Sequence, residues 1–196
     1  MNAFLAHAPV AWYVARAAGL VAFGFLTLSV WLGLVMSTRL ATRLQKHLFG
    51  WHQTLAWTGL SMLALHAGAL LLDPTLHFGL PSVLVPFASA WRPGAVAAGV
   101  VAGWLVLMLA LSFRLRRVIG QRGWRRLHYA SFAAFFLSLG HALTAGSDLR
   151  GVNGPILAAL AAGPAVWLIF YRVLAPRPGR TSAKPVVTIR PSPDSA

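Results

Sequence analysis

Five long runs of predominantly apolar residues, separated by short polar or basic segments, dominate the chain. They cover residues 12–36, 49–72, 94–113, 124–145 and 152–174. About 20 apolar residues span the hydrocarbon core of a bilayer as a helix. Backbone groups in lipid have to be hydrogen-bonded within their own segment, which favours helices over isolated strands. We therefore expect an all-α integral membrane protein, a bundle of about five transmembrane helices.

The balance of charged and apolar residues argues against a soluble globular enzyme. Of the 196 residues, 58% are hydrophobic and only 10% are charged, whereas soluble domains carry about 25% charged residues. The formal charge of +14 is typical of nucleic-acid-binding proteins. Those proteins are polar between their basic residues, however, and here the basic residues lie between apolar runs. The expected partner is membrane lipid, and no nucleic acid is expected.

The positions of the basic residues predict the orientation in the membrane. Of the 17 Lys and Arg residues, 14 lie in the segments after the first, third and fifth apolar runs or at the helix ends that adjoin those segments, on one side of the predicted bundle. Because cytoplasmic loops carry an excess of Lys and Arg, the N-terminus is expected outside and the C-terminus in the cytoplasm. We expect a short extracytoplasmic segment (1–10), a transmembrane domain (11–175) and a disordered cytoplasmic tail (176–196). Such a multi-pass protein fits a cell membrane, here the bacterial inner membrane. Between the second and third runs, residues 73–93 are expected to form an interfacial loop with at most a short helix.

Histidines are the main candidate functional groups within the apolar runs. Cysteine is absent, which excludes thiolate zinc sites, iron–sulfur clusters and covalently attached haem. His52 and His66 lie on the second predicted helix, and His128 and His141 lie on the fourth. These two helices run in the same direction, so one histidine from each is expected at an inner level and one from each at an outer level. Ionisable groups inside a membrane are functional candidates by default.

The spacing of the histidines agrees with ideal helical geometry on only one of the two helices. His66 comes 14 residues after His52, so in an ideal helix the two side chains point in directions that differ by ~40°. Thirteen residues separate His128 from His141, which ends ~140° away. Two explanations stay open: the fourth helix is locally irregular, or its two histidines approach their ligands from different directions.

Two neutral imidazoles on facing helices suit the ligation of a haem iron from both sides. Two such pairs would hold two b-type haems one above the other, between the two faces of the membrane. The alternative interpretation is that the four histidines form polar contacts between helices. In that case the chain is a haem-free membrane scaffold or a transporter subunit, with the histidines as hydrogen-bonding groups or a proton relay.

Two segments that contain these histidines resemble the ferric reductase-like transmembrane family. They are HQTLAWTGLSMLALHAGALLLD and WRRLHYASFAAFFLSLGHALTAGSD, and ARAAGLVAFGFLTLSVWLGLVMSTR is similar to the first helix of small bacterial members. The family includes ferric reductases, NADPH oxidase membrane domains and the haem subunit of periplasmic methionine sulfoxide reductase. The resemblance covers about residues 10–175. It implies His52 with His128 at an inner b-type haem, His66 with His141 at an outer one, and electron transfer across the membrane.

The chain departs from the larger family members at its C-terminal end. Those members carry a flavin and nicotinamide domain after the last helix, whereas only residues 176–196 follow here. The expectation is an oxidoreductase component that lacks its own flavin domain. A separate protein, a free flavin or a quinone would donate electrons, and an acceptor would lie at the outer face. One alternative is the membrane haem subunit of a two-component periplasmic reductase.

Four arginines are candidate partners for the carboxylates of the haems. Arg16 lies near the outer end of the first helix, and Arg92 lies in an outer loop. Arg125 and Arg126 are close in sequence to His128 and could pair with carboxylates of the inner haem. Each also has a simpler interpretation: Arg16 can reach the outer headgroups, Arg92 can be an ordinary loop residue, and Arg125 and Arg126 can be positive-inside charges.

The remaining histidines and the glycines have less specific expectations. His47 is expected to be solvated, His77 to be a surface residue, and His7 has no assigned role. The glycines, Gly19 and Gly99 among them, are expected to allow close packing of helices.

Overall fold

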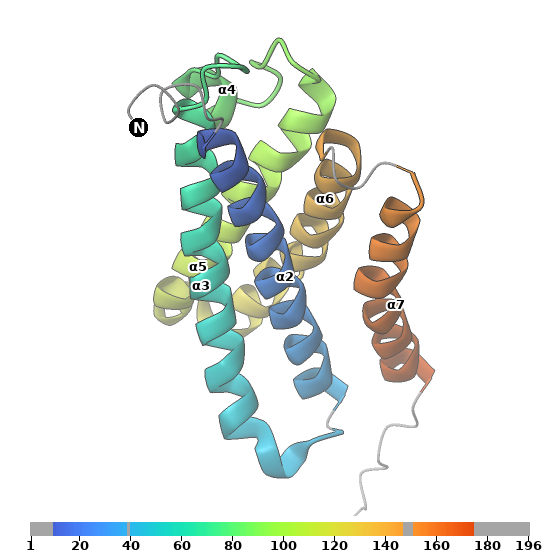
Figure 1. Cartoon of the computed structure of the whole chain (residues 1–196). Coiled ribbons are helices and arrows are strands. Elements are labelled where there is room, and N and C mark those ends of the chain that lie inside the picture. Colours follow the sequence, from blue (N-terminus) through green and yellow to red (C-terminus); the bar gives the residue numbers. More distant parts are fainter. Residues whose placement is uncertain (1–9, 39, 147–150, 175–196) are drawn as a thin grey trace, which may run out of the picture.

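The computed structural model describes residues 10–38, 40–146 and 151–174. Every regular element within these ranges is helical (Figure 1). The elements are α2 (Val10–Thr38), η1 (Thr42–Leu44), α3 (Gln45–Leu71), α4 (Leu80–Leu84), α5 (Pro93–His128), α6 (Ala130–Ala145) and α7 (Asn153–Leu174). The predicted tail at 176–196, and all but the last residue of the predicted outer segment at 1–10, lie outside the described residues.

Four helical runs in the described part of the chain are long and apolar enough to cross a membrane. They are Val10–Thr38, Thr42–Leu71, Pro93–Ala145 and Asn153–Leu174. Their surfaces expose large apolar side chains that a soluble protein would bury. Leu160, Trp167 and Phe170 on α7 are 63%, 59% and 60% exposed. The described part of the chain is therefore all-α, with helices suited by length and composition to span a membrane.

The run Pro93–Ala145 contains both the third and the fourth predicted helices. Gly120 has a φ of 70° inside α5, a backbone conformation that glycine adopts without steric cost. The start of α5 lies against the end of α6, since Ala95 accepts a hydrogen bond from His141. The run therefore bends at Gly120, and its two ends meet (Figure 1).

The predicted end of the third helix at residue 113 is wrong. The helix continues as far as the bend at Gly120, so the arginines at 114, 116 and 117 are on a helix and not in a loop. Arg and Leu, which fill positions 114–117, are good helix formers. Glycine is the first residue there that permits the sharp change of direction.

Small residues allow α2 to lie close against its neighbours. Ala15, Ala18 and Ala22 are buried on α2. A Cβ atom at Gly59 of α3 would lie 2.8 Å from the Leu26 side chain of α2. Such close approach is typical of membrane helices, which pack through small side chains rather than through a water-driven hydrophobic effect.

Helix α7 packs against α2 and α6. Phe23, Phe135 and Ala161 belong to one buried apolar cluster that joins the three helices. Pro164 lies inside α7 and removes one backbone donor from the helix. Close to that point the indole Nε1 of Trp31 on α2 donates a hydrogen bond to the Ala161 carbonyl, at 3.0 Å, and so ties α7 to the bundle.

The loop between α3 and α5 contains the short helix α4, as the sequence predicts. Phe78 of this loop is buried with Val96 and Val100 of α5. The indole Nε1 of Trp104 donates to the carbonyl of Leu84, at 2.8 Å. These contacts hold the loop against one end of α5, next to the candidate site.

Candidate functional site

The four histidines within the helices form two pairs in the structure. The ring centroids of His52 and His128 are 6.2 Å apart, with ring planes at 70°. The ring centroids of His66 and His141 are 6.3 Å apart, with ring planes at 77°. We name these the 52–128 pair and the 66–141 pair. Along α3 the two pairs are separated by about 21 Å, at 1.5 Å of rise per residue.

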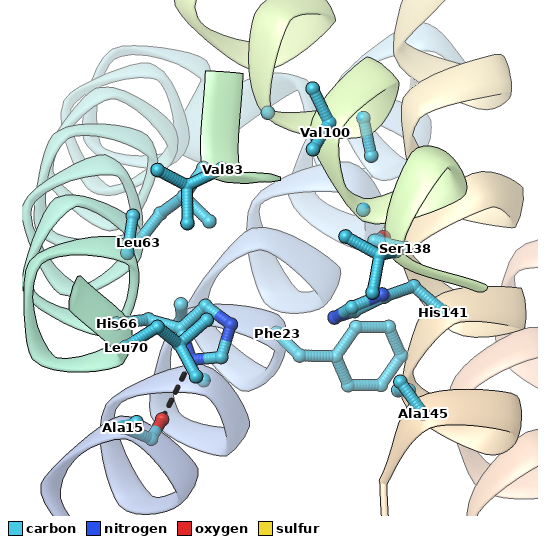
Figure 2. Close-up of a pocket in the computed structure, with 18 of the residues that line it drawn as sticks. Ala15, Phe23, Leu63, His66, Leu70, Val83, Val100, Ser138, His141 and Ala145 are labelled. Atoms are coloured by element: carbon cyan, nitrogen blue, oxygen red, sulfur yellow. Dashed lines mark hydrogen bonds between the residues drawn. The ribbon is translucent and has the colours of Figure 1, made fainter. Parts of the chain in front are cut away.

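Both rings of the 66–141 pair are anchored to main-chain carbonyls. The Nδ1 of His66 donates to the Ala15 carbonyl of α2 at 2.7 Å, and the Nδ1 of His141 donates to the Ala95 carbonyl of α5 at 2.8 Å. A carbonyl oxygen only accepts hydrogen bonds, so each Nδ1 carries the proton. In the neutral ring, Nε2 then carries a free lone pair. Figure 2 shows the second ring nitrogen of His66 turned toward His141, and a ring nitrogen of His141 turned toward His66.

Glycines create the space that these two rings occupy. A Cβ atom at Gly19 would lie 2.8 Å from the Nδ1 of His66, and one at Gly99 would lie 2.6 Å from the Nδ1 of His141. Each glycine comes four residues after the carbonyl that accepts the hydrogen bond, one helical turn further along the same face. The imidazole reaches the carbonyl because no side chain covers it.

The sequence contains a signal for this arrangement that composition and histidine spacing do not reveal. Residues 15–19 read ARAAG and residues 95–99 read AVAAG. The shared pattern is an alanine whose carbonyl accepts the hydrogen bond and a glycine four residues later. The expected role of Gly19 and Gly99 in close packing is met, but the group that they accommodate is an imidazole of the candidate site.

In the 52–128 pair, His52 is anchored in a similar way. Its Nδ1 donates to the main-chain carbonyl of Ser29 on α2 at 2.8 Å and lies 2.9 Å from the Ser29 hydroxyl. That hydroxyl donates to the carbonyl of His52 at 3.2 Å. Gly33 is again four residues beyond the carbonyl, and a Cβ atom there would lie 3.5 Å from the His52 ring.

His128 is held differently. Its Nδ1 is buried and has no hydrogen-bond partner among the described residues. The ring stacks on the indole of Trp124, with centroids 4.9 Å apart and planes at 26°. Directly after His128 the helix is interrupted at Tyr129, whose carbonyl accepts from Phe132, three residues on. Local irregularity was one of the two explanations for the spacing of 13 residues.

A cavity of about 610 Å³ opens at the 66–141 pair. This volume is within the 300–1,000 Å³ typical of small-molecule and cofactor sites. Side chains from α2, α3, α4, α5 and α6 form its walls, and most are apolar (Figure 2); they include Phe23, Leu63, Val83, Val100 and Ser138.

The residues of the 66–141 pair fit a bis-histidine haem. An imidazole nitrogen lies about 2 Å from a first-row metal ion, so two imidazoles on opposite sides of one ion have ring centroids about 6 Å apart. Ordinary edge-to-face ring contacts cover the same distances. The distance alone therefore does not distinguish a ring contact from a metal-binding pair, and the direction of the nitrogen lone pairs is the distinguishing feature. Two nitrogens that only accept face each other, and a metal ion held by His66 and His141 would accept both lone pairs. Among the described residues no group of three or more His, Cys, Asp or Glu could hold a metal ion.

Of the four candidate arginines, Arg16 lies at the cavity and the other three are exposed. Arg16 lines the cavity wall, and its guanidinium carbon lies 3.9 Å from the centroid of the Trp12 ring. Arg92 is exposed at the start of α5 and donates to the Thr144 carbonyl of α6. Arg125 and Arg126 are exposed on the segment that follows Gly120.

The other histidines do not join the two pairs. His47 and His77 are exposed, as the sequence predicts, and His77 has a φ of 50°. His7 lies outside the described residues.

Comparison with known proteins adds no relative for this chain. No family model, no curated protein and no solved structure matches it at a significant level.

Proposed function

We propose that this protein is a membrane cytochrome that transfers electrons across the bilayer through two b-type haems. The observation that carries the proposal is the 66–141 pair. Two carbonyl-anchored imidazoles turn free nitrogens toward each other across 6.3 Å between ring centroids, beside a cavity of cofactor size. Haem iron held in this way supplies one-electron oxidation and reduction.

Each group of side chains has a separate task in this proposal. His66 and His141 would hold one haem, and His52 and His128 would hold the other. The Ala15 and Ala95 carbonyls fix the direction of their histidines and make the imidazoles more basic ligands. The apolar walls exclude water, which limits access of other ligands to the centre. Arg16 is the candidate partner for a haem carboxylate, because an arginine can bind a carboxylate through two hydrogen bonds.

The proposed path crosses the membrane because the two pairs lie at different depths along α3. We propose five crossings, counting both arms of the run Pro93–Ala145, with the N-terminus outside and the C-terminus in the cytoplasm. The 52–128 pair is then near the cytoplasmic face, and the 66–141 pair is near the outer face. A protein, flavin or quinone would donate electrons on the inner side, and an acceptor would take them on the outer side. The resemblance of residues 10–175 to the ferric reductase-like family supports the same assignment.

The absorbance spectrum and haem content of the purified protein test the proposal. We expect Soret and α bands of a low-spin b-type cytochrome and two haems per chain after expression with sufficient haem. His66→Ala and His52→Ala should each remove about half of the haem, and the exposed His47→Ala and His77→Ala are controls that should remove none. A well-folded protein without haem absorbance would refute the proposed function. Unchanged haem content in both helix variants would refute the assignment of the ligands.

A further inference from the structure

Three of the four paired histidines are held by the main chain, and one is held by a side chain. His52, His66 and His141 each donate from Nδ1 to a backbone carbonyl. His128 has no such bond within the described residues. No side-chain substitution removes a backbone carbonyl, whereas the support of His128 can be removed by changing Trp124.

The indole of Trp124 is well placed to fix the plane of the His128 ring. The two residues are one helical turn apart, and their rings are nearly parallel, with centroids 4.9 Å apart. Trp124 is itself held by Phe113 of the other arm of α5, at 6.1 Å and 78°. Phe113 in turn contacts Phe49 of α3, at 6.2 Å. The row of rings therefore links the position of His128 to α3, the helix that carries His52.

The surroundings of Trp124 argue against a role as an ordinary space-filling residue. Its indole Nε1 and the His128 Nδ1 are both buried without a hydrogen-bond partner in the described part of the chain. Leaving a buried donor unsatisfied is unfavourable, and a leucine or methionine would fill the space without an unsatisfied donor. The ring contacts that an indole adds over these side chains are the edge contact with Phe113 and the stacking on His128.

We propose that Trp124 is the positioning residue for His128: its stacked indole fixes the plane of the imidazole where the other three histidines use a carbonyl. This inference rests on the proposed function, and it deepens that function by making the two centres unequal. Stacking restrains the ring without raising its basicity, whereas a hydrogen bond from Nδ1 does both. The ligand set of the 52–128 pair is thus the one that depends on a single side chain.

Trp124→Leu and Trp124→Met remove the stacking but keep an apolar side chain, and Trp124→Phe keeps an aromatic ring. The matched control is Trp167 on α7, which stacks on Tyr171 with the same spacing in sequence, at 5.8 Å and 25°, and contacts neither histidine pair. Trp167→Leu and Trp167→Phe therefore make the same chemical changes in a stacked pair remote from the candidate site.

Low-temperature electron paramagnetic resonance and a redox titration of the purified ferric proteins are the measurements. We expect Trp124→Leu and Trp124→Met to shift the low-spin signal and the midpoint potential of one centre, the one that is missing in His52→Ala. Trp124→Phe should restore both values, and the Trp167 variants should match the wild type. The unchanged signal of the 66–141 centre shows, within the same sample, that each variant is folded.

The inference is overturned if Trp124→Leu and Trp124→Met leave both signals and both potentials at their wild-type values. It is also overturned if Trp124→Phe departs from the wild type as far as Trp124→Leu does, because the aromatic ring would then not be the supporting element. A wild-type protein that binds no haem would instead refute the proposed function, so the two failures are distinguishable.

Discussion

The 66–141 pair and the 52–128 pair have almost the same geometry but different supports. Their ring centroids are 6.3 and 6.2 Å apart, and their ring planes meet at 77° and 70°. In the first pair both imidazoles are anchored to carbonyls of α2 and α5. In the second pair only His52 is anchored in this way, and His128 stacks on Trp124. The same distance between two imidazole rings is therefore found whether the rings are held by main-chain carbonyls or one of them is held by a stacked side chain.

The difference between the pairs follows from the helices that surround them. Where a helix offers a carbonyl to a neighbouring imidazole, the residue one turn further on has to leave room for the ring. Gly19 and Gly99 meet this requirement for the 66–141 pair, and Gly33 meets it for His52. We therefore expect glycine substitutions to weaken mainly the 66–141 pair. The effect should be larger where the added Cβ atom lies closer to the histidine ring.

The largest effect is expected for Gly99→Ala. The new Cβ atom would lie 2.6 Å from the Nδ1 of His141, 2.8 Å from its Cε1 and 2.9 Å from its Cγ, so the ring has to leave the Ala95 carbonyl. Loss of such a second-layer contact typically weakens metal binding about 10–100-fold. We expect haem content to fall from two toward one per chain. Gly140→Ala, next to His141 but with open space at its Cβ position, is the control.

Gly19→Ala should act in the same direction but less strongly. Its Cβ atom would lie 2.8 Å from the Nδ1 of His66 and 3.1 Å from Cε1. The measurement is the same haem-to-protein ratio, followed during dilution into haem-free detergent. Gly24→Ala on the same helix, where a Cβ atom meets nothing within 4 Å, should retain both haems. If Gly19→Ala and Gly24→Ala retained haem equally well, the glycine would have no role at the centre.

An intermediate effect is expected for Arg16→Gln. This arginine lines the cavity of the 66–141 pair, and removal of a positive charge near an iron centre favours its oxidised form. We expect a lower midpoint potential for that centre and an unchanged potential for the 52–128 centre in a redox titration. Arg92→Gln, at an exposed arginine, is the control. Equal shifts in both centres would mean that Arg16 acts only through the overall charge.

The smallest effect is expected for Ser29→Ala. This change removes the hydroxyl that bonds to the His52 carbonyl but leaves the main-chain carbonyl that accepts from the His52 Nδ1. One ordinary hydrogen bond contributes about 1 kcal/mol, so both haems should be retained with a small loss of thermal stability. Loss of a haem in this variant would show that the hydroxyl, and not the main chain, holds His52.

Most helices could be predicted from the sequence because apolar runs are local patterns, and the two histidine pairs could be predicted because the second and fourth helices are expected to run in the same direction. The continuation of the third predicted helix past residue 113, as far as the bend inside α5, could not, since the preference of Arg114, Arg116 and Arg117 for a helix competes with their resemblance to a charged loop. The bend falls at Gly120 because glycine can adopt a positive φ. The positions of the charged residues do not determine where the helix bends.

The supports of the histidines depend on contacts between helices. Nothing in the apolar pattern shows that Trp124 stacks on His128, because the pattern does not give the side-chain conformations that bring the two rings together. The anchoring by Ala15 and Ala95 is different, since the repeated pattern of ARAAG and AVAAG was available in the sequence. The pattern can be assigned to histidine anchoring only once the structure shows that α3 and α6 bring His66 and His141 to those two segments.

The central claim is that each histidine pair holds one iron from both sides. The electron paramagnetic resonance spectrum of the ferric wild-type protein tests it most directly, because the angle between two axial imidazole planes sets the g values of low-spin haem iron. With planes at 70° and 77°, we expect two low-spin signals, each dominated by one large g value. Only high-spin iron, or no haem signal at all, would contradict the claim.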